Sequence, residues 1–234
     1  MLTTIFDTFW TNLLDTSWLE FIAVVFGLLS VWLAKQEKIL VYPTGIISVL
    51  IYVYICFNVK LYAYAGINFF FFIMSVYGWY MWSKKSDKPV LKISACSVKN
   101  WITVAVMFGM SIIIIVALLK IFKADDAEYW STKIPYIDTV TTAIFIVSMW
   151  LMALKKVENW IFWIIGDAVS VPLYAYKGLV FTSFQYLVFL IIAVLGYMAW
   201  RKNCLLSEHD KTNHYNRAGK HREIKTCRRF GKPL

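Results

Sequence analysis

The sequence lacks the residues and motifs on which most enzymes depend. Charged side chains make up 16% of its 234 residues, whereas about 25% is usual in soluble proteins. It contains no GxSxG, Walker or HExxH motif, and its three histidines all lie beyond residue 208. These absences argue against an ATP-driven pump and an intramembrane protease. We therefore expect no enzymatic activity.

Cysteine is also scarce, and its placement excludes a familiar kind of metal site. The four cysteines are scattered and form no CxxC pair, so the sequence predicts no zinc site. The position of the histidines argues equally against a transition metal held within the apolar part of the chain. We expect neither a metal nor an organic cofactor.

Apolar residues dominate what remains. They make up 60% of the sequence, against about 45–50% in soluble chains. A membrane-spanning helix needs about 20 mostly apolar residues, and this criterion predicts an all-α integral membrane protein with seven transmembrane helices. The predicted spans are 18–34, 42–59, 61–82, 101–122, 139–154, 160–176 and 179–200. The fifth of these spans is short and rich in threonine.

The two ends of the chain differ in charge. The first 17 residues contain neither Lys nor Arg, so we expect no cleavable signal peptide. Apolar residues at helical spacing predict that residues 1–17 form an amphipathic helix on the outer membrane surface, with a frayed terminus as the alternative. The basic tail, residues 201–234, is expected to be disordered after about Cys204 and to be attracted to anionic lipid.

The distribution of basic residues predicts the orientation. The formal net charge is +10, which in another chain would suggest nucleic acid. Here the Lys and Arg residues stand between apolar segments and in the tail, and 19 of the 24 fall on one side of the seven predicted spans. Because basic loops stay in the cytoplasm, the C-terminus is predicted to be cytoplasmic and the N-terminus outside. We expect no nucleic-acid partner.

An internal repeat is also visible. The motif G-[WY]-x-x-W ends the third and the seventh predicted spans, at 78–82 and 196–200, an offset of 118. Leu61 and Leu179 keep this offset, whereas Glu37 and Glu158, each eight residues before a glycine, are 121 apart. We predict two parallel three-helix repeats, 18–82 and 139–200, joined by residues 83–138 with a linker helix, as in SWEET-type transporters. Chance similarity among apolar segments is the alternative.

One face of the sixth span carries the strongest candidate site. Trp160, Trp163, Asp167 and Tyr174 share a helical stripe, and Asp167 lies about 10 Å deeper than Trp160. An ionisable group at such a depth points to a functional site. An interfacial aromatic belt is the alternative for the tryptophans, and a structural hydrogen bond is the alternative for Asp167.

Other candidates come from the remaining helices of the two repeats. Ser48 and Tyr52 form the matching stripe in the first repeat, and Asn68 and Gln185 hold nearly corresponding positions. Amide side chains can bind a carboxamide or sugar hydroxyls, although packing between helices explains them as well. Thr182 is a weaker candidate.

Two acidic residues stand just before predicted helix starts. For Glu37 and Glu158 we favour a role in helix capping and in stabilising the helix dipole over a role in binding.

These residues resemble the PnuC family of bacterial vitamin transporters. The resemblance rests on the E-x-x-x-x-x-x-x-G pattern, Trp160-x-x-Trp163, the turn Lys60-Leu61-Tyr62-Ala63 and the paired G-[WY]-x-x-W ends, and it runs from about Trp18 to Trp200. It implies a 3+1+3 plan similar to that of SWEET proteins. It also implies facilitated diffusion of nicotinamide riboside across the bacterial inner membrane, followed by phosphorylation and NAD synthesis.

The resemblance also implies roles for the candidate residues. It assigns the Trp160-x-x-Trp163 motif to nicotinamide riboside binding. The cationic ring of that substrate suits a tryptophan face, Asp167 can offset its charge, and Asn68 or Gln185 can bind the carboxamide or the ribose. Thiamine and riboflavin, which relatives carry, are alternative substrates. A membrane receptor or scaffold without transport is the alternative of a different class. Besides its substrate and the lipid bilayer the sequence implies no partner, and homo-oligomerisation stays open.

Overall fold

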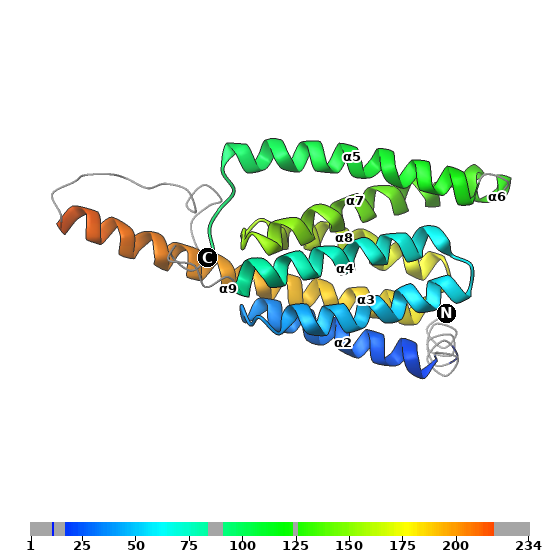
Figure 1. Cartoon of the computed structure of the whole chain (residues 1–234), viewed down its shortest axis with the longest axis horizontal. Helices are drawn as coiled ribbons and strands as arrows, with labels where there is room; N and C mark the ends of the chain where they lie inside the picture. The colour runs from blue at the N-terminus through cyan, green and yellow to red at the C-terminus, as the bar shows by residue number, and fades with distance from the viewer. Residues whose placement is uncertain (1–10, 12–16, 84–90, 124–125, 218–234) are drawn as a thin grey trace.

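A computed structural model describes residues 11, 17–83, 91–123 and 126–217. Within these ranges the chain is helical except for its turns, one loop and one isolated β-bridge, and the long helices run side by side along a common axis (Figure 1). The helices are α2 (Trp18–Lys35), α3 (Val41–Asn58), α4 (Tyr62–Ser83), α5 (Val98–Phe122), α6 (Ala127–Ser131), α7 (Ile134–Ala153), α8 (Asn159–Tyr176) and α9 (Val180–Arg217). The predicted amphipathic helix, residues 1–17, lies almost entirely outside the described residues.

Five of the described helices are long and apolar enough to cross a membrane. They are α2, α3, α5, α7 and the Val180–Ser207 part of α9. Helices α4 and α8 have similar lengths, 22 and 18 residues, but their Trp, Tyr, Asn and Asp side chains lower their mean hydropathy. The all-α architecture expected from the sequence is therefore confirmed.

Two helices differ from the predicted spans, both for local reasons. Helix α7 begins at Ile134 rather than 139, because Pro135 fits the first turn of a helix, where its missing N–H costs nothing. Helix α9 continues to Arg217. The stretch from Cys204 to Arg217 contains no Gly or Pro to stop it. The prediction of disorder after Cys204 is therefore wrong as far as Arg217, and the rest of the tail lies outside the described residues.

The long helices form two groups of three. In the first unit α3 packs against α2 and α4, and in the second unit α8 packs against α7 and α9. The units meet through α2 against α9 and through α4 against α7, so the first helix of each unit contacts the third helix of the other. Helix α5 lies at the edge of the bundle, against α7 and α4 (Figure 1).

The turns of the two units match at a constant offset of 118 residues. Left-handed backbone occurs at Glu37 (φ 56°) and Lys155 (φ 50°), and again at Lys60 (φ 61°) and Gly178 (φ 76°). The hydrogen bonds match as well, because the Lys38 N–H donates to the Leu33 carbonyl and the Lys156 N–H donates to the Leu151 carbonyl. The predicted offset of 121 for the upstream part is therefore wrong, since Glu37 corresponds to Lys155 and not to Glu158.

A ring–glycine contact joins the second and third helices of each unit. The Tyr42 ring on α3 lies against Gly78 on α4, where even a Cβ atom would clash with it. The Trp160 ring on α8 lies against Gly196 on α9, where a Cβ would come within 2.6 Å of the indole. Both pairs are related by the same offset of 118, so the glycines of the G-[WY]-x-x-W motif are needed for close packing.

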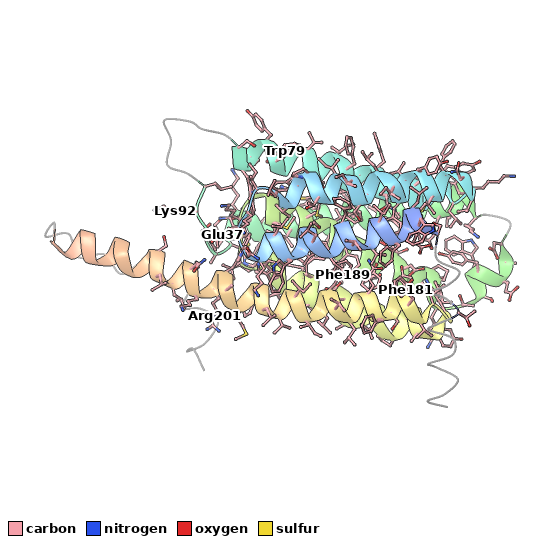
Figure 2. All side chains as sticks on the ribbon, turned by 90° about the horizontal axis from the view of Figure 1, so that it is seen from below. Glu37, Trp79, Lys92, Phe181, Phe189 and Arg201 are labelled. Atoms are coloured by element: carbon pink, nitrogen blue, oxygen red, sulfur yellow. The ribbon has the colours of Figure 1, made fainter. Side chains whose placement is uncertain are left out.

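The loop before α5 is fixed to the second unit. Ser94 forms an isolated parallel bridge with Lys156, and the Lys156 ammonium donates to the Ser94 hydroxyl at 2.9 Å. Ser97 then begins α5 with a capping box that it shares with Asn100. The loop and the α7–α8 turn therefore form one packed piece at the end of the bundle where Glu37 and Arg201 lie (Figure 2).

We predict that Gly196→Ala lowers stability by about 1–3 kcal/mol, because the added methyl group must displace the Trp160 ring. Thermal unfolding of the purified protein in detergent measures this change. Gly109→Ala is the matched control, since a Cβ there meets nothing within 4 Å and alanine favours a helix interior by about 1 kcal/mol. Equal melting temperatures for the two variants would contradict the packing described here.

Candidate functional site

A cavity lies between the two units. The space between its atoms, including the open mouth, is about 960 Å³. Helices α2, α3, α4, α7, α8 and α9 all contribute to its wall. Its walls are mainly apolar and aromatic, with a few hydroxyl groups and one carboxylate.

Stacked aromatic rings form one wall and continue beyond it. The Trp163 ring stacks on Phe145 with centroids 5.2 Å apart, Phe145 lies 6.1 Å from Tyr186, and Tyr186 stacks on Tyr174 at 5.0 Å. Trp163, Phe145 and Tyr186 line the cavity, whereas Tyr174 lies beyond it. This aromatic column offers flat ring faces to a planar ligand.

A second aromatic group closes the cavity at the end near Glu37. Tyr42 and Trp160 line the cavity and pack edge to face against Trp82 and Trp200, at 5.1 and 5.6 Å. Trp82 and Trp200 in turn lie 6.2 Å apart. We call these four rings the aromatic floor. Its two halves are related by the offset of 118.

Asp167 is the single acidic or basic side chain among the described residues that line the cavity. It is 2% exposed, and no described residue forms a hydrogen bond or an ion pair with it. Two of the lining serine hydroxyls are already committed as donors, since Ser48 donates to the Ala23 carbonyl at 2.8 Å and Ser75 donates to the Phe71 carbonyl at 2.9 Å. The buried hydroxyl of Tyr42, by contrast, has no hydrogen-bond partner among the described residues. A buried carboxylate without a partner is costly, so Asp167 is poised for a cationic or hydrogen-bonding ligand.

The structure brings together some of the predicted site residues and separates others. Trp160, Trp163, Asp167 and Ser48 line the cavity. Trp160 is 1% exposed, and its indole N–H has no hydrogen-bond partner among the described residues. Five predicted residues do not belong to the cavity wall: Tyr52, Asn68, Tyr174, Thr182 and Gln185.

Those residues instead lie nearer the end of the bundle where Lys177 is found. The Gln185 amide lies near the Tyr52 hydroxyl. The Asn68 amide donates to the Tyr64 carbonyl within α4, at 2.9 Å. The contacts of both amides are therefore with residues outside the cavity wall.

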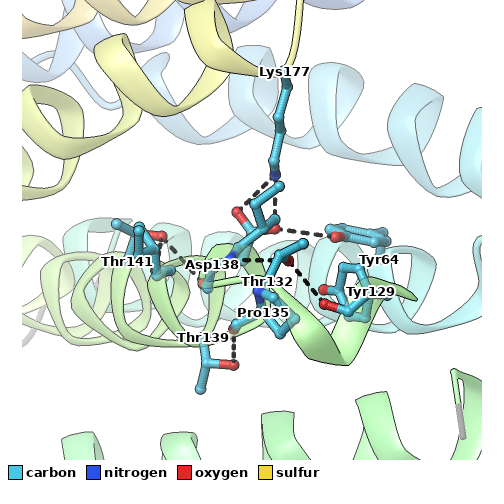
Figure 3. Close-up of polar contacts among 10 residues, drawn as sticks. Tyr64, Tyr129, Thr132, Pro135, Asp138, Thr139, Thr141 and Lys177 are labelled. Atoms are coloured by element: carbon cyan, nitrogen blue, oxygen red, sulfur yellow. Dashed lines mark hydrogen bonds and ion pairs between the residues drawn. The ribbon is translucent and has the colours of Figure 1, made fainter. Parts of the chain in front are cut away.

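A polar cluster closes that end of the bundle (Figure 3). The Lys177 ammonium forms an ion pair with Asp138 at 2.7 Å, lies 5.0 Å from the centre of the Tyr174 ring, and shares Asp138 with the Tyr64 hydroxyl at 3.4 Å. Nearby, burial raises the pKa of Tyr129. The Tyr129 backbone N–H and the Lys123 ammonium together lower the pKa of Asp126.

The two acidic residues predicted as helix caps have other partners. The Glu37 carboxylate pairs with Lys155 at 3.4 Å and accepts a hydrogen bond from the Asn203 amide at 2.9 Å. The Glu158 carboxylate makes no cap hydrogen bond to α8 and accepts from the Cys96 backbone N–H at 2.8 Å instead. The capping prediction is therefore wrong, because both side chains point to segments distant in sequence. Burial and the Glu158 carboxylate raise the pKa of the Cys96 thiol.

Sequence reasoning missed several residues of the wall. Phe145, Tyr186 and Phe189 give no signal in a chain so rich in aromatic residues, since only packing separates them from lipid-facing rings. Tyr42 is different, because the offset of 118 pairs it with Trp160. Alignment of the two repeats at that single offset would have identified Tyr42 as a candidate residue of the cavity wall.

The fold and the cavity define a class: a helical membrane protein with a cavity between its two three-helix units. The model of the family described as "Nicotinamide mononucleotide transporter" matches residues 17–202. The chain belongs to this family.

Individual relatives agree with the family match. The chain is 32% identical over 205 residues to the nicotinamide riboside transporter PnuC of Escherichia coli K12, covering 80% of this chain and 86% of the relative. It is 26% identical over 183 residues to the riboflavin/roseoflavin transporter RibM of Streptomyces davaonensis, covering 78% and 84%. The crystal structure of the vitamin B3 transporter PnuC superposes with a TM-score of 0.61 at 25% identity, covering 86% of this chain and 88% of that one.

We predict that Lys177→Met lowers stability by about 1–3 kcal/mol, because it leaves the Asp138 carboxylate, 10% exposed, without its ion-pair partner. The double variant Asp138→Asn/Lys177→Met removes both charges and is expected to recover most of this loss. Thermal unfolding of the two variants and the wild type supplies the comparison. A single variant as stable as the double variant would show that the ion pair has no structural role.

Proposed function

We propose that this chain carries nicotinamide riboside across the bacterial inner membrane by facilitated diffusion, as a uniporter that feeds NAD synthesis. The observation that carries the proposal is the unpartnered Asp167 carboxylate in a cavity walled by stacked aromatic rings. A carboxylate and ring faces together suit a flat cationic ligand. The PnuC relatives and the PnuC crystal structure, which bear the names of nicotinamide riboside and vitamin B3, support the same substrate class.

The cationic pyridinium ring of the substrate fits the Trp163 end of the aromatic column. In this position it lies over the Trp163 face, and Asp167, one helical turn further along α8, supplies its counter-charge. A desolvated cation–π contact contributes about 2 kcal/mol. The substrate ring thus meets both the Trp163 face and the Asp167 carboxylate, and the carboxylate has no other hydrogen-bond or ion-pair partner among the described residues.

Trp160 plays a different part from the stacking role expected from the sequence. The six-membered side of its indole packs against Gly196, and Trp200 packs edge to face against the ring. Its unpartnered N–H is a spare donor, and a carboxamide or a ribose oxygen of the substrate can accept it. We propose Trp160 as a hydrogen-bond donor and Trp163 as the stacking residue.

The charge of the cavity favours a nucleoside over a nucleotide. A phosphate group needs Arg, Lys or a helix N-terminus, and no Lys or Arg is found among the described lining residues. Asp167 would repel a phosphate. The mononucleotide that names the family is therefore the less suitable ligand for this chamber.

The membrane arrangement that we propose has seven spans, formed by α2, α3, α4, α5, α7, α8 and α9, in a 3+1+3 plan. The matching turns and ring–glycine contacts support two parallel repeats related by an axis along the membrane normal, as in SWEET-type transporters. The charge asymmetry supports an outer N-terminus and a cytoplasmic C-terminus. Reporters fused before Trp18 and after Trp200 test this orientation, and activity from the same side would overturn it.

Uptake of labelled nicotinamide riboside into proteoliposomes tests the function. Saturable uptake that stops at equal concentrations inside and outside is the result expected of a uniporter. Nicotinamide mononucleotide, thiamine and riboflavin serve as competitors, and the mononucleotide is expected to compete poorly. Binding without uptake would favour the receptor alternative, and neither binding nor uptake would overturn the proposal.

Riboflavin is the second candidate, favoured by the RibM relative and by the flat aromatic wall. It has no cationic ring, so Asp167 would serve only as a hydrogen-bond acceptor. Saturable uptake of riboflavin in preference to nicotinamide riboside would select this candidate.

We predict that Trp163→Leu weakens nicotinamide riboside binding by a few-fold to about thirtyfold, since it removes a cation–π contact of about 0.5–2 kcal/mol. Trp160→Phe, which removes the indole N–H but keeps a ring against Gly196, is expected to have a smaller effect. Calorimetric titration measures both, with the melting temperature without ligand as the control for folding. Two folded variants that bind as tightly as the wild type would place the site elsewhere.

We predict that Asp167→Asn weakens binding of the cationic riboside by about tenfold or more, a loss of about 1.4 kcal/mol, because the counter-charge disappears while size and shape are kept. The reduced dihydropyridine form of the riboside is uncharged, so its binding should change little. The same titration with both ligands gives the ratio of the two losses of affinity. Equal losses for the two forms would show that Asp167 does not respond to the charge of the ring.

A further inference from the structure

Glu37 and Lys155 occupy corresponding positions of the two units and meet each other. Each stands in the turn between the first and second helices of its unit, with left-handed backbone. Their side chains form an ion pair at 3.4 Å, with 28% of the glutamate and 11% of the lysine side chain exposed. Since residues related by the offset of 118 touch only near the axis between the units, we call Glu37 and Lys155 the axial pair.

Neighbouring contacts at this end also cross between the units. The Lys155 ammonium of the second unit lies 4.4 Å from the centre of the Trp82 ring of the first, and the Asn203 amide of α9 donates to Glu37. The indole N–H of Trp82 donates to the Ala153 carbonyl at 3.2 Å, and that of Trp200 donates to the Ala34 carbonyl at 3.1 Å. Each of these interactions breaks if the units separate here.

The axial pair lies beyond the aromatic floor, on the side away from the cavity. Tyr42 and Trp160 line the cavity, and Trp82 and Trp200 pack against them from one helical turn past Gly78 and Gly196. A molecule that leaves the cavity towards Glu37 must therefore pass between rings held together by contacts between the units. No such passage can open while the axial pair and the two indole hydrogen bonds persist.

The opposite end is built differently. Its ion pair joins Asp138 on α7 to Lys177 at the end of α8, so both partners belong to the second unit. The contact of that ion pair with the first unit is the long hydrogen bond from Tyr64, at 3.4 Å. Separation of the units at that end leaves the Asp138–Lys177 ion pair intact. Separation at the end where Glu37 lies breaks the ion pair between Glu37 and Lys155.

We propose that the axial pair is the latch of the gate on the basic side of the protein, which the charge distribution makes the cytoplasmic side. The conformation described here has this gate shut. Opening it requires the Glu37 and Lys155 side chains to part and the aromatic floor to separate into its two halves. This inference rests on the proposed transport function for its physiological meaning, but the closed contact itself does not depend on the substrate.

A reversible cross-link tests whether the axial pair must part. In a background with the four cysteines replaced by serine, Glu37→Cys and Lys155→Cys are joined by a short bis-methanethiosulfonate reagent that reductant removes. Cross-linking is expected to reduce uptake of nicotinamide riboside to about a tenth or less, and reductant should restore it, because alternating access needs both states. Uptake at the rate of the unlinked protein would overturn the latch.

A matched control pair lies on the same face of the protein. Ser94 and Lys156 are bonded at 2.9 Å, and both belong to the packed piece formed by the loop and the α7–α8 turn. Joining Ser94→Cys to Lys156→Cys with the same reagent should leave uptake unchanged. Equal inhibition by both cross-links would mean that any bridge at this face stops transport, and the specific latch would be rejected.

A second measurement uses no substrate. Ser75 lines the cavity, so the variant Ser75→Cys in the same background places a reactive thiol there. In inside-out vesicles, labelling of this thiol by a charged, membrane-impermeant methanethiosulfonate reports entry of the reagent from the side of Glu37. Glu37→Gln should raise the labelling rate by about fivefold or more, the size of a modest coupling between states. The swap Glu37→Lys/Lys155→Glu should return it towards the original rate. A Glu37→Gln rate equal to that of the parent would overturn the latch.

The two measurements separate the latch from the proposed function. If the unlinked protein takes up no nicotinamide riboside, the proposed substrate is wrong, and the labelling measurement still decides the latch. If uptake is normal and neither the cross-link nor Glu37→Gln has an effect, the substrate stands and the latch is rejected. Melting temperatures of all variants control for misfolding.

Discussion

In both three-helix units an aromatic ring of the second helix lies directly on a glycine of the third, and much of the remaining architecture follows from this close approach. With no hydrophobic effect between helices in lipid, small residues that let backbones come close are a main source of packing energy. The Tyr42–Gly78 and Trp160–Gly196 contacts fix each pair of helices. They also set the two rings where the indoles of Trp82 and Trp200 can close over them. The aromatic floor of the cavity therefore results from helix packing.

The cavity contains several features that lower the stability of a protein interior. It holds open space, an unpartnered indole N–H at Trp160, an unpartnered hydroxyl at Tyr42 and the buried carboxylate of Asp167. Each of these costs stability. Most other polar groups nearby are bonded, as the Ser48 and Ser75 hydroxyls are. Unmet bonding capacity in an enclosed space is typical of a binding site, where a ligand supplies the missing partners.

The sequence predicted the architecture better than the side-chain contacts. Apolar length predicted the helices, and the stripe of Trp160, Trp163 and Asp167 predicted one wall of the cavity. Phe145 and Tyr186 were missed because hydropathy cannot separate a ring that faces a chamber from one that faces lipid. Glu37 and Glu158 were misread as caps because their true partners, Lys155 and Cys96, are distant in sequence. Capping is a local rule, and these contacts depend on tertiary packing.

At several positions of the cavity wall, residues related by the offset of 118 differ in size or charge. Trp163 and Phe145 on the aromatic wall correspond to Gly45 and Gly27, which also line the cavity, and Asp167 corresponds to Val49. At these positions the second unit supplies rings and a carboxylate, whereas the first unit leaves space where the corresponding side chains would stand. The two sides of the cavity therefore present unlike surfaces, and unlike surfaces distinguish one orientation of an asymmetric ligand from the other. Filling Gly45 or Gly27 with a large side chain would make the halves more alike and leave no room for cargo.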